Sequence, residues 1–234
     1  MHLKRSLLLS LYQEMKQLKA ALFDLDGVIF DTEPQYDIFW GQQFEKRFPD
    51  RPQLAREIKG QTLVQILDRL FPDGGHEEDK AEIVQELDAF EAQMPYEYVD
   101  GVQAFVADLR LNGVKTAVVT SSNHVKMDSV RRARPDFDSQ FDAVLTSEDF
   151  AESKPSPDCY LRAAARFGAS PDECVVFEDS FNGLRSGLAA KMFVVGLATT
   201  NPREKIVPLS DCQTDDFRHW DFATLTAKCI VHSA

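Results

Sequence analysis

Two aspartates, Asp24 and Asp26, directly follow the apolar run Ala20–Phe23, with only Leu25 between them. The run predicts a central strand, and open α/β sheets bind their ligands at the carboxyl edge of such strands. A pair of carboxylates at that edge suits phosphate chemistry. From this motif alone, a strand followed by an Asp-Gly turn at Gly27 is an equally good interpretation, because both residue types tolerate turn backbone.

Polar side chains also follow three further apolar runs. The runs are Thr116–Val119, Ala143–Leu145 and Cys174–Phe177. The polar residues that follow them are, in chain order, Thr120 with Ser121, then Lys154, then Glu178 with Asp179. Four predicted strands thus lead to polar side chains of complementary types, which favours a site over a simple turn.

The order of these residues, Asp-x-Asp, then Thr, then Lys, then Glu-Asp, resembles the haloacid dehalogenase (HAD) superfamily. Within it, the chain is similar to the branch of small phosphatases and β-phosphoglucomutases. The resemblance runs from about Lys19 to about Pro202 and is specific for the superfamily rather than for a substrate. It implies an α/β fold with a Rossmann-like parallel sheet core and an inserted α-helical cap.

The pattern of the chain agrees with that fold, because apolar runs alternate with amphipathic stretches, as in a parallel sheet with crossover helices. Asn112-Gly113 ends one helix, and Ser180 is a plausible N-cap of another. The expected helices of the core are 102–111, 155–167, 181–190 and a last one within 217–230, and strands are expected at 114–119 and 192–196.

Between Thr32 and Tyr98 the character of the sequence changes. β-branched runs are missing there, and helical segments are expected at 34–48, 61–71 and 77–94, separated by prolines and by Gly74-Gly75. We expect a core of residues 1–33 and 99–234 and a cap of residues 34–98 that closes over the site and excludes water. The alternative is a helical bundle that only decorates the core.

The resemblance implies a role for each motif residue. Asp24 would attack phosphorus and form an aspartyl-phosphate, and Asp26 would be the general acid and then the base. Thr120 and Ser121 would hold phosphate oxygens through hydroxyl and backbone N–H groups. Lys154 would supply a fixed cation for the charge that phosphoryl transfer spreads over the equatorial oxygens.

A metal site is implied by the same residues. By resemblance, Asp179 is the stronger candidate ligand, together with Asp24 and the backbone carbonyl of Asp26, while Glu178 would bind directly or through water. The net charge of −12 makes a local cation necessary for an anionic substrate. We infer Mg²⁺, which prefers oxygen ligands and retains waters.

Within the cap, the sequence departs from the mutases. In β-phosphoglucomutases a Lys-Gly is followed three residues after the Gly by an Arg that grips the sugar phosphate, and a His lies near the hinge. Here Leu63 stands at the Arg position after Lys59-Gly60, and Tyr36 at the His position. The cap residues expected to contact substrate are Gln35, Tyr36, Lys59, Gln61 and Thr62.

Because Leu63 replaces the Arg that would bind a second phosphate, the sequence favours a phosphatase acting on a small phosphorylated metabolite, such as a sugar phosphate. The alternative is a sugar phosphomutase of the β-phosphoglucomutase type, which must hold a bisphosphate by both ends. A non-catalytic binding protein of this fold is less well supported, because Asp24, Asp26 and Lys154 are all present. Asp26 also speaks against a dehalogenase.

The remaining features set the expected context. The acidic balance argues against nucleic acid and membranes as partners, and a monomer is expected. The cysteines, Cys159, Cys174, Cys212 and Cys229, have no zinc or redox spacing, which indicates reduced thiols and a cytoplasmic protein. Leu7–Leu11 is too short for a signal peptide or a membrane span. Residues 1–14 are expected to be an extension upstream of a chain that could begin at Met15.

Overall fold

The computed structural model describes residues 18–51, 53–59 and 61–232, so the expected extension, residues 1–14, lies outside the described residues. A single parallel sheet forms the centre, with the strand order β3-β2-β1-β4-β5-β6. The strands are β1 (Ala20–Phe23), β2 (Lys115–Val119), β3 (Ala143–Leu145), β4 (Cys174–Glu178), β5 (Phe193–Leu197) and β6 (Cys212–Thr214). This confirms the expected α/β core.

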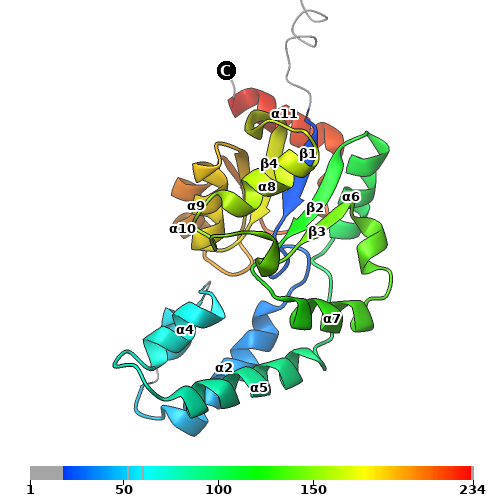
Figure 1. The fold of residues 1–234 in the computed structure, drawn as a ribbon. Coiled ribbons are helices and arrows are strands. Elements are labelled where there is room, and N and C mark those ends of the chain that lie inside the picture. Colours follow the sequence, from blue (N-terminus) through cyan, green and yellow to red (C-terminus); the bar gives the residue numbers. More distant parts are fainter. Residues whose placement is uncertain (1–17, 52, 60, 233–234) are drawn as a thin grey trace, which may run out of the picture.

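Helices cover both faces of the sheet (Figure 1). The helices that pack on one face are α6 (Val102–Leu111), α7 (His124–Ala133) and α11 (Phe222–His232). Those on the other face are α8 (Asp158–Arg166), α9 (Phe181–Ala189) and α10 (Arg203–Ile206). Short 3-10 helices are η1 (Phe137–Gln140), η2 (Ser147–Asp149), η3 (Pro171–Glu173) and η4 (Val207–Leu209). Among the described residues, none of the helices has the length and apolar character of a membrane span.

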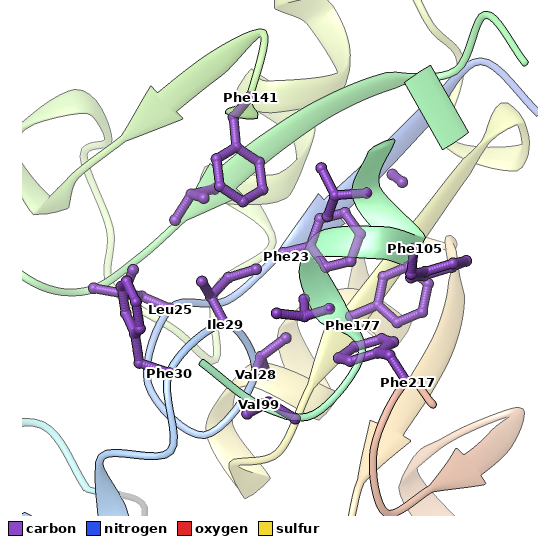
Figure 2. Close-up of a cluster of buried hydrophobic side chains, with 14 of the residues drawn as sticks. Phe23, Leu25, Val28, Ile29, Phe30, Val99, Phe105, Phe141, Phe177 and Phe217 are labelled. Atoms are coloured by element: carbon purple, nitrogen blue, oxygen red, sulfur yellow. The ribbon is translucent and has the colours of Figure 1, made fainter. Parts of the chain in front are cut away.

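Aromatic packing anchors the two central strands. Figure 2 shows Phe23 of β1 beside Phe177 of β4, and their rings stack with centroids 4.5 Å apart. Phe105 of α6 and Phe217 cover this pair and stack on each other at 5.3 Å. Full burial of such a side chain contributes about 1.5–3 kcal/mol. The cluster therefore fixes the end of β1, from which Asp24 emerges.

A separate helical layer faces the carboxyl edge of the sheet (Figure 1). It consists of α2 (Glu33–Arg47), α3 (Leu54–Glu57), α4 (Leu63–Leu70) and α5 (Glu77–Glu91). These helices share a core of their own, in which Phe39, Trp40 and Phe44 are buried, as helical spacing had indicated. The inserted helical cap is thus confirmed, while the boundaries at 34 and 98 stay a prediction.

Backbone hydrogen bonds connect the two linkers between core and cap. Asp31 N–H donates to Glu97 O at 2.8 Å, and Val99 N–H donates to Ile29 O at 2.9 Å. The chain therefore leaves and re-enters the core at one place, which is where a cap must pivot.

Two expected helix starts were wrong by a few residues. The helix expected from Pro155 begins at Asp158, because the residue before Pro157 is kept out of helical backbone. The helix expected from Gln61 begins at Leu63, since the Thr62 hydroxyl caps it. The last helix begins at Phe222, inside the expected range 217–230 and after Phe217 has been buried in the core, and it ends at His232.

Candidate active site

The carboxyl ends of three adjacent strands bring the predicted residues together. Asp24 follows β1, Thr120 follows β2, and Asp179 follows β4, and these strands are neighbours in the order β2-β1-β4. Together with Ser121 and Lys154 they line one cavity of about 660 Å³ between the sheet edge and the cap. The edge between β1 and β4 is also where the strand order reverses direction, the usual place for a ligand in open α/β sheets.

Lys154 occupies the centre of the buried part of this site and is 4% exposed. Its Nζ donates to Asp24 Oδ1 at 2.7 Å, to Glu178 Oε1 at 2.6 Å and to Val119 O at 3.0 Å. Every hydrogen of the ammonium then has an acceptor. Burial alone would lower the pKa of Lys154, but the carboxylates of Asp24 and Glu178 raise it, so the group stays a cation.

Two carboxyl groups are held in an unfavourable environment. Burial raises the pKa of Asp24 to about 7, with Lys154 opposing and Glu178 adding to the rise. Burial, followed by the charges of Glu178 and Asp24, raises the pKa of Asp179 well above its ordinary value. Such groups need a positive charge beside them if both are to ionise near neutral pH.

The donor set fits a divalent cation. Carboxylate oxygens of Asp24, Glu178 and Asp179 lie within 4.8 Å of one another. Asp179 Oδ1 is buried and has no hydrogen-bond partner among the described residues. An unpartnered buried carboxylate oxygen beside a second carboxylate is what a hard, oxygen-seeking ion requires.

Glu178 differs from the other two, because both of its oxygens already have protein partners. Oε1 accepts from Lys154 and from the Tyr160 hydroxyl at 2.8 Å, and Oε2 accepts from the backbone of Asp179 and Ser180 at 3.1 and 3.2 Å. The local geometry of Glu178 therefore suits a residue that fixes Lys154 and the turn after β4.

Gly27 lets the loop after β1 approach Asp179. Its φ is +71°, and a Cβ there would lie 2.1 Å from Asp179 Oδ2 and 2.9 Å from the Thr200 hydroxyl. Any side chain would therefore collide with the acidic cluster. The Thr200 hydroxyl donates to the same carboxylate oxygen, and Asn201 donates to Asp179 O at 3.0 Å. Sequence reasoning missed Thr200 and Asn201, which lie in the loop after β5.

We predict that removal of divalent ions makes stability fall as pH rises. Unfolded aspartate titrates near pH 4 and folded Asp24 near 7, so the folded state binds more protons in between, and its stability decreases through that window. Thermal unfolding in EDTA should give a lower midpoint at about pH 8 than at about pH 5, and Mg²⁺ should raise the midpoint more at the higher pH. Equal effects of Mg²⁺ at both values would contradict the acidic cluster as its site.

Asp26 lies beside this cluster on the loop after β1 and is held by three side chains. Its Oδ1 accepts from the Thr32 hydroxyl at 2.8 Å, and its Oδ2 accepts from the Ser122 hydroxyl at 3.3 Å and from Lys126 Nζ. Lys126 also contacts the Tyr36 hydroxyl. Sequence reasoning did not single out Lys126, which belongs to α7 and to no predicted motif.

The cap supplies the distal wall of the cavity. Tyr36, Lys59, Gln61 and Thr62 line it, as does Leu63, which stands where the mutases have Arg. Lys59 Nζ is paired with Asp37 at 2.9 Å and lies 3.8 Å from Glu33. The positive charge of Lys59 is therefore already balanced within the cap.

Gln35 is the one cap residue from the sequence analysis that does not line this cavity. It lines a smaller hollow of about 380 Å³ formed with Phe39 and Phe90. One residue turns a helix by about 100°, so Gln35 and its neighbour Tyr36 face different sides of α2. With the cap in the position that the structure shows, Gln35 does not line the catalytic cavity, and its expected contact with substrate has no support.

A parallel sheet, a helical cap and a buried lysine among carboxylates at the sheet edge define a capped α/β protein with an acidic site at the sheet edge. The chain matches the haloacid dehalogenase-like hydrolases over residues 18–191. It is 28% identical to β-phosphoglucomutase of Bacillus subtilis (strain 168) over 197 residues, 79% of this chain and 85% of that one. It is 32% identical to hexitol phosphatase A of Escherichia coli (strain K12) over 183 residues, 76% of this chain and 82% of that one.

Among solved structures, a β-phosphoglucomutase from Clostridium difficile superimposes with a TM-score of 0.76 at 20% identity, over 93% of this chain and 99% of that one. At 20% identity, this structural similarity supports the fold alone. The chain belongs to the haloacid dehalogenase-like hydrolases, in their β-phosphoglucomutase-like branch. The family and the site together make it a hydrolase of phosphoric monoesters.

Proposed function

We propose that the protein is a Mg²⁺-dependent phosphatase that hydrolyses a small phosphorylated metabolite, such as a sugar phosphate, through an aspartyl-phosphate on Asp24. The observation that carries this proposal is the placement of Asp24. It is a carboxylate at the end of a central strand, bonded to Lys154 at 2.7 Å, beside the unpartnered Asp179 Oδ1 and open to the cavity.

In the first step, an Asp24 oxygen attacks phosphorus and the ester P–O bond breaks. Lys154 fixes the attacking carboxylate, and Thr120 and Ser121 bind phosphate oxygens from the end of β2. Asp26 gives its proton to the leaving oxygen, which avoids release of an alkoxide. The products of this step are the free alcohol and the aspartyl-phosphate.

In the second step, water attacks the aspartyl-phosphate. Asp26, now a carboxylate, takes a proton from that water, and cleavage of the P–O bond to Asp24 regenerates the nucleophile and releases inorganic phosphate. Asp24, Asp179 and the backbone carbonyl of Asp26 would hold the cation. When bound, Mg²⁺ would offset the charge of the phosphate oxygens and of the two carboxylates.

The distal cavity wall supports a neutral polyhydroxylated leaving group. Gln61, Thr62, Gln65 and Asn182 line it with neutral amide and hydroxyl side chains, and the Lys59 charge is balanced by Asp37. Neutral donors and acceptors suit sugar or alditol hydroxyls better than a second phosphate. One relative with phosphatase activity in its name is a hexitol phosphatase, which agrees with this choice.

The second candidate is a sugar phosphomutase, because a β-phosphoglucomutase is among the relatives. A mutase must hold a bisphosphate intermediate at both ends, and Leu63 offers no charge for the second phosphate. Water attacks the aspartyl-phosphate unless remote binding energy holds another hydroxyl in line. The phosphatase is therefore the proposal that the cavity supports better.

For its setting, we propose a cytoplasmic monomer that acts on free metabolites. Cys159 and Cys174 are free buried thiols, and Cys212 is also free, as expected of a reducing compartment. The net charge of −12 is unsuited to binding nucleic acid or an anionic bilayer.

Product analysis tests the two candidates. We expect phosphate release from sugar and hexitol phosphates in Mg²⁺ and none in EDTA, with no need for a sugar bisphosphate as primer. A panel with nucleotides and phosphoglycolate would locate the substrate class. With β-glucose 1-phosphate, if it is accepted, we expect free glucose. Efficient, bisphosphate-primed formation of glucose 6-phosphate would overturn the phosphatase in favour of the mutase.

A further inference from the structure

Lys126 is a buried cation outside every motif of the site. It lies in the first turn of α7, after the Asn123 side chain has capped that helix, and it is 5% exposed. Lys126 lines the catalytic cavity, as does Lys154. Ion pairs that take a lysine fully out of water are costly, and they gain little stability over an apolar side chain. The charge of Lys126 therefore needs another explanation.

The contacts of Lys126 join the core to the cap. On the core side, Nζ donates to Asp26 Oδ2. On the cap side, Nζ contacts the Tyr36 hydroxyl of α2, lies 4.9 Å from the centre of that ring, and is 3.9 Å from Glu91 Oε1 of α5. The Tyr36 hydroxyl in turn donates to Glu91 Oε1 at 2.7 Å.

Asp26 has no other charged partner among the residues that the structure describes, since its remaining contacts are the hydroxyls of Thr32 and Ser122. The ammonium therefore restricts where the Asp26 carboxylate can point more strongly than the two neutral donors do. Because the same ammonium contacts Tyr36 and lies 3.9 Å from Glu91, the orientation of the Asp26 carboxylate depends on the position of the cap.

We propose that Lys126 is a positioning residue that ties Asp26 to the cap, so that the carboxylate is aligned for proton transfer when α2 and α5 are seated against α7. The inference rests on the proposed function, because it assigns Lys126 to the same reaction. Lys126 acts through Asp26 and takes no part in binding phosphate, which is the task of Lys154 and Thr120.

The test separates the two steps by the leaving group. A p-nitrophenyl ester releases a stable phenolate that needs no proton, whereas a sugar phosphate releases an alkoxide that does. With enzyme in excess, the first-step rate of Lys126→Met should stay within a few-fold of wild type for p-nitrophenyl phosphate and fall about 10²-fold for a sugar phosphate. In steady state, the variant should show a burst of p-nitrophenolate followed by slow turnover, because water attack still needs Asp26 as base.

Three further variants make the test specific. Lys126→Arg keeps the charge and should recover most of the lost rate. In an Asp26→Asn background, Lys126→Met should lower the first-step rate for the sugar phosphate by a further factor of less than about three. A residue that acts through Asp26 then has no carboxylate left to position. Lys115→Met, a surface lysine paired with Asp142 at 2.8 Å, is the matched control and should match wild type.

An equal fall of the first-step rate for both esters, or full additivity of Lys126→Met with Asp26→Asn, would overturn the inference and leave the phosphatase intact. A wild-type protein that releases phosphate from neither ester and never carries a phosphoryl group would overturn the proposed function, and the inference with it.

Discussion

Asp24→Asn is expected to leave no measurable turnover and no phosphoenzyme. The amide has the size of the carboxylate, so the stacked Phe23 and the surrounding loop should keep their places. Its nitrogen and oxygen are far weaker nucleophiles than a carboxylate oxygen, so the covalent step is lost. Quenched reactions analysed by intact mass should show phosphate on wild type and none on the variant.

Asp26→Ala is the companion variant, and its expected defect is different in kind. Losing a general acid and base should lower turnover by about 10²–10⁴-fold, while Asp24 is still labelled slowly by a reactive donor such as acetyl phosphate. A donor whose leaving group needs no proton bypasses Asp26 in the first step. Equal and mild effects of the two substitutions would rule out the assigned roles.

The fold was predictable because its signals are local. Ala20–Phe23 and Cys174–Phe177 are apolar along their whole length, as strands buried on both faces of a parallel sheet require. The positions of Asp24, Thr120 and Asp179 also followed, since the carboxyl ends of parallel strands share one edge. What the sequence leaves open is strand order, and the structure supplies it by placing β1 between β2 and β4.

Contacts between core and cap were beyond the reach of the sequence. Lys126 meets Asp26 across 100 positions within the core, and it meets Tyr36 of the cap across 90, a contact that depends on how the cap is seated. Lys126 lies on a helix and outside the predicted motifs, and in the sequence alone such a lysine has the same local pattern as a surface lysine. Gln35 illustrates the reverse case, in which a sound helix prediction did not fix which side of α2 faces the cavity.

Lys154→Met is expected to damage both stability and activity. The substitution leaves Asp24 and Glu178 close together in a buried site without their shared cation, and breaking such a buried pair costs about 3–5 kcal/mol. Turnover should fall by about 10²–10³-fold, because a fixed charge beside the transferring phosphoryl group is lost. Urea unfolding at several pH values and phosphate release together measure the two effects.

The pH dependence identifies the cause of that lost stability. Without Lys154, the pKa of Asp24 rises further above its unfolded value, so the variant binds a proton on folding over a wider pH range and loses stability as pH increases. The gap to wild type should therefore be larger at about pH 8 than at about pH 5. Tyr160→Phe is the control, because it removes only one hydrogen bond to Glu178, worth about 1 kcal/mol, and leaves the cation in place. A gap that does not change with pH would mean that Lys154 contributes packing by its alkyl chain and that its charge does not balance the two carboxylates.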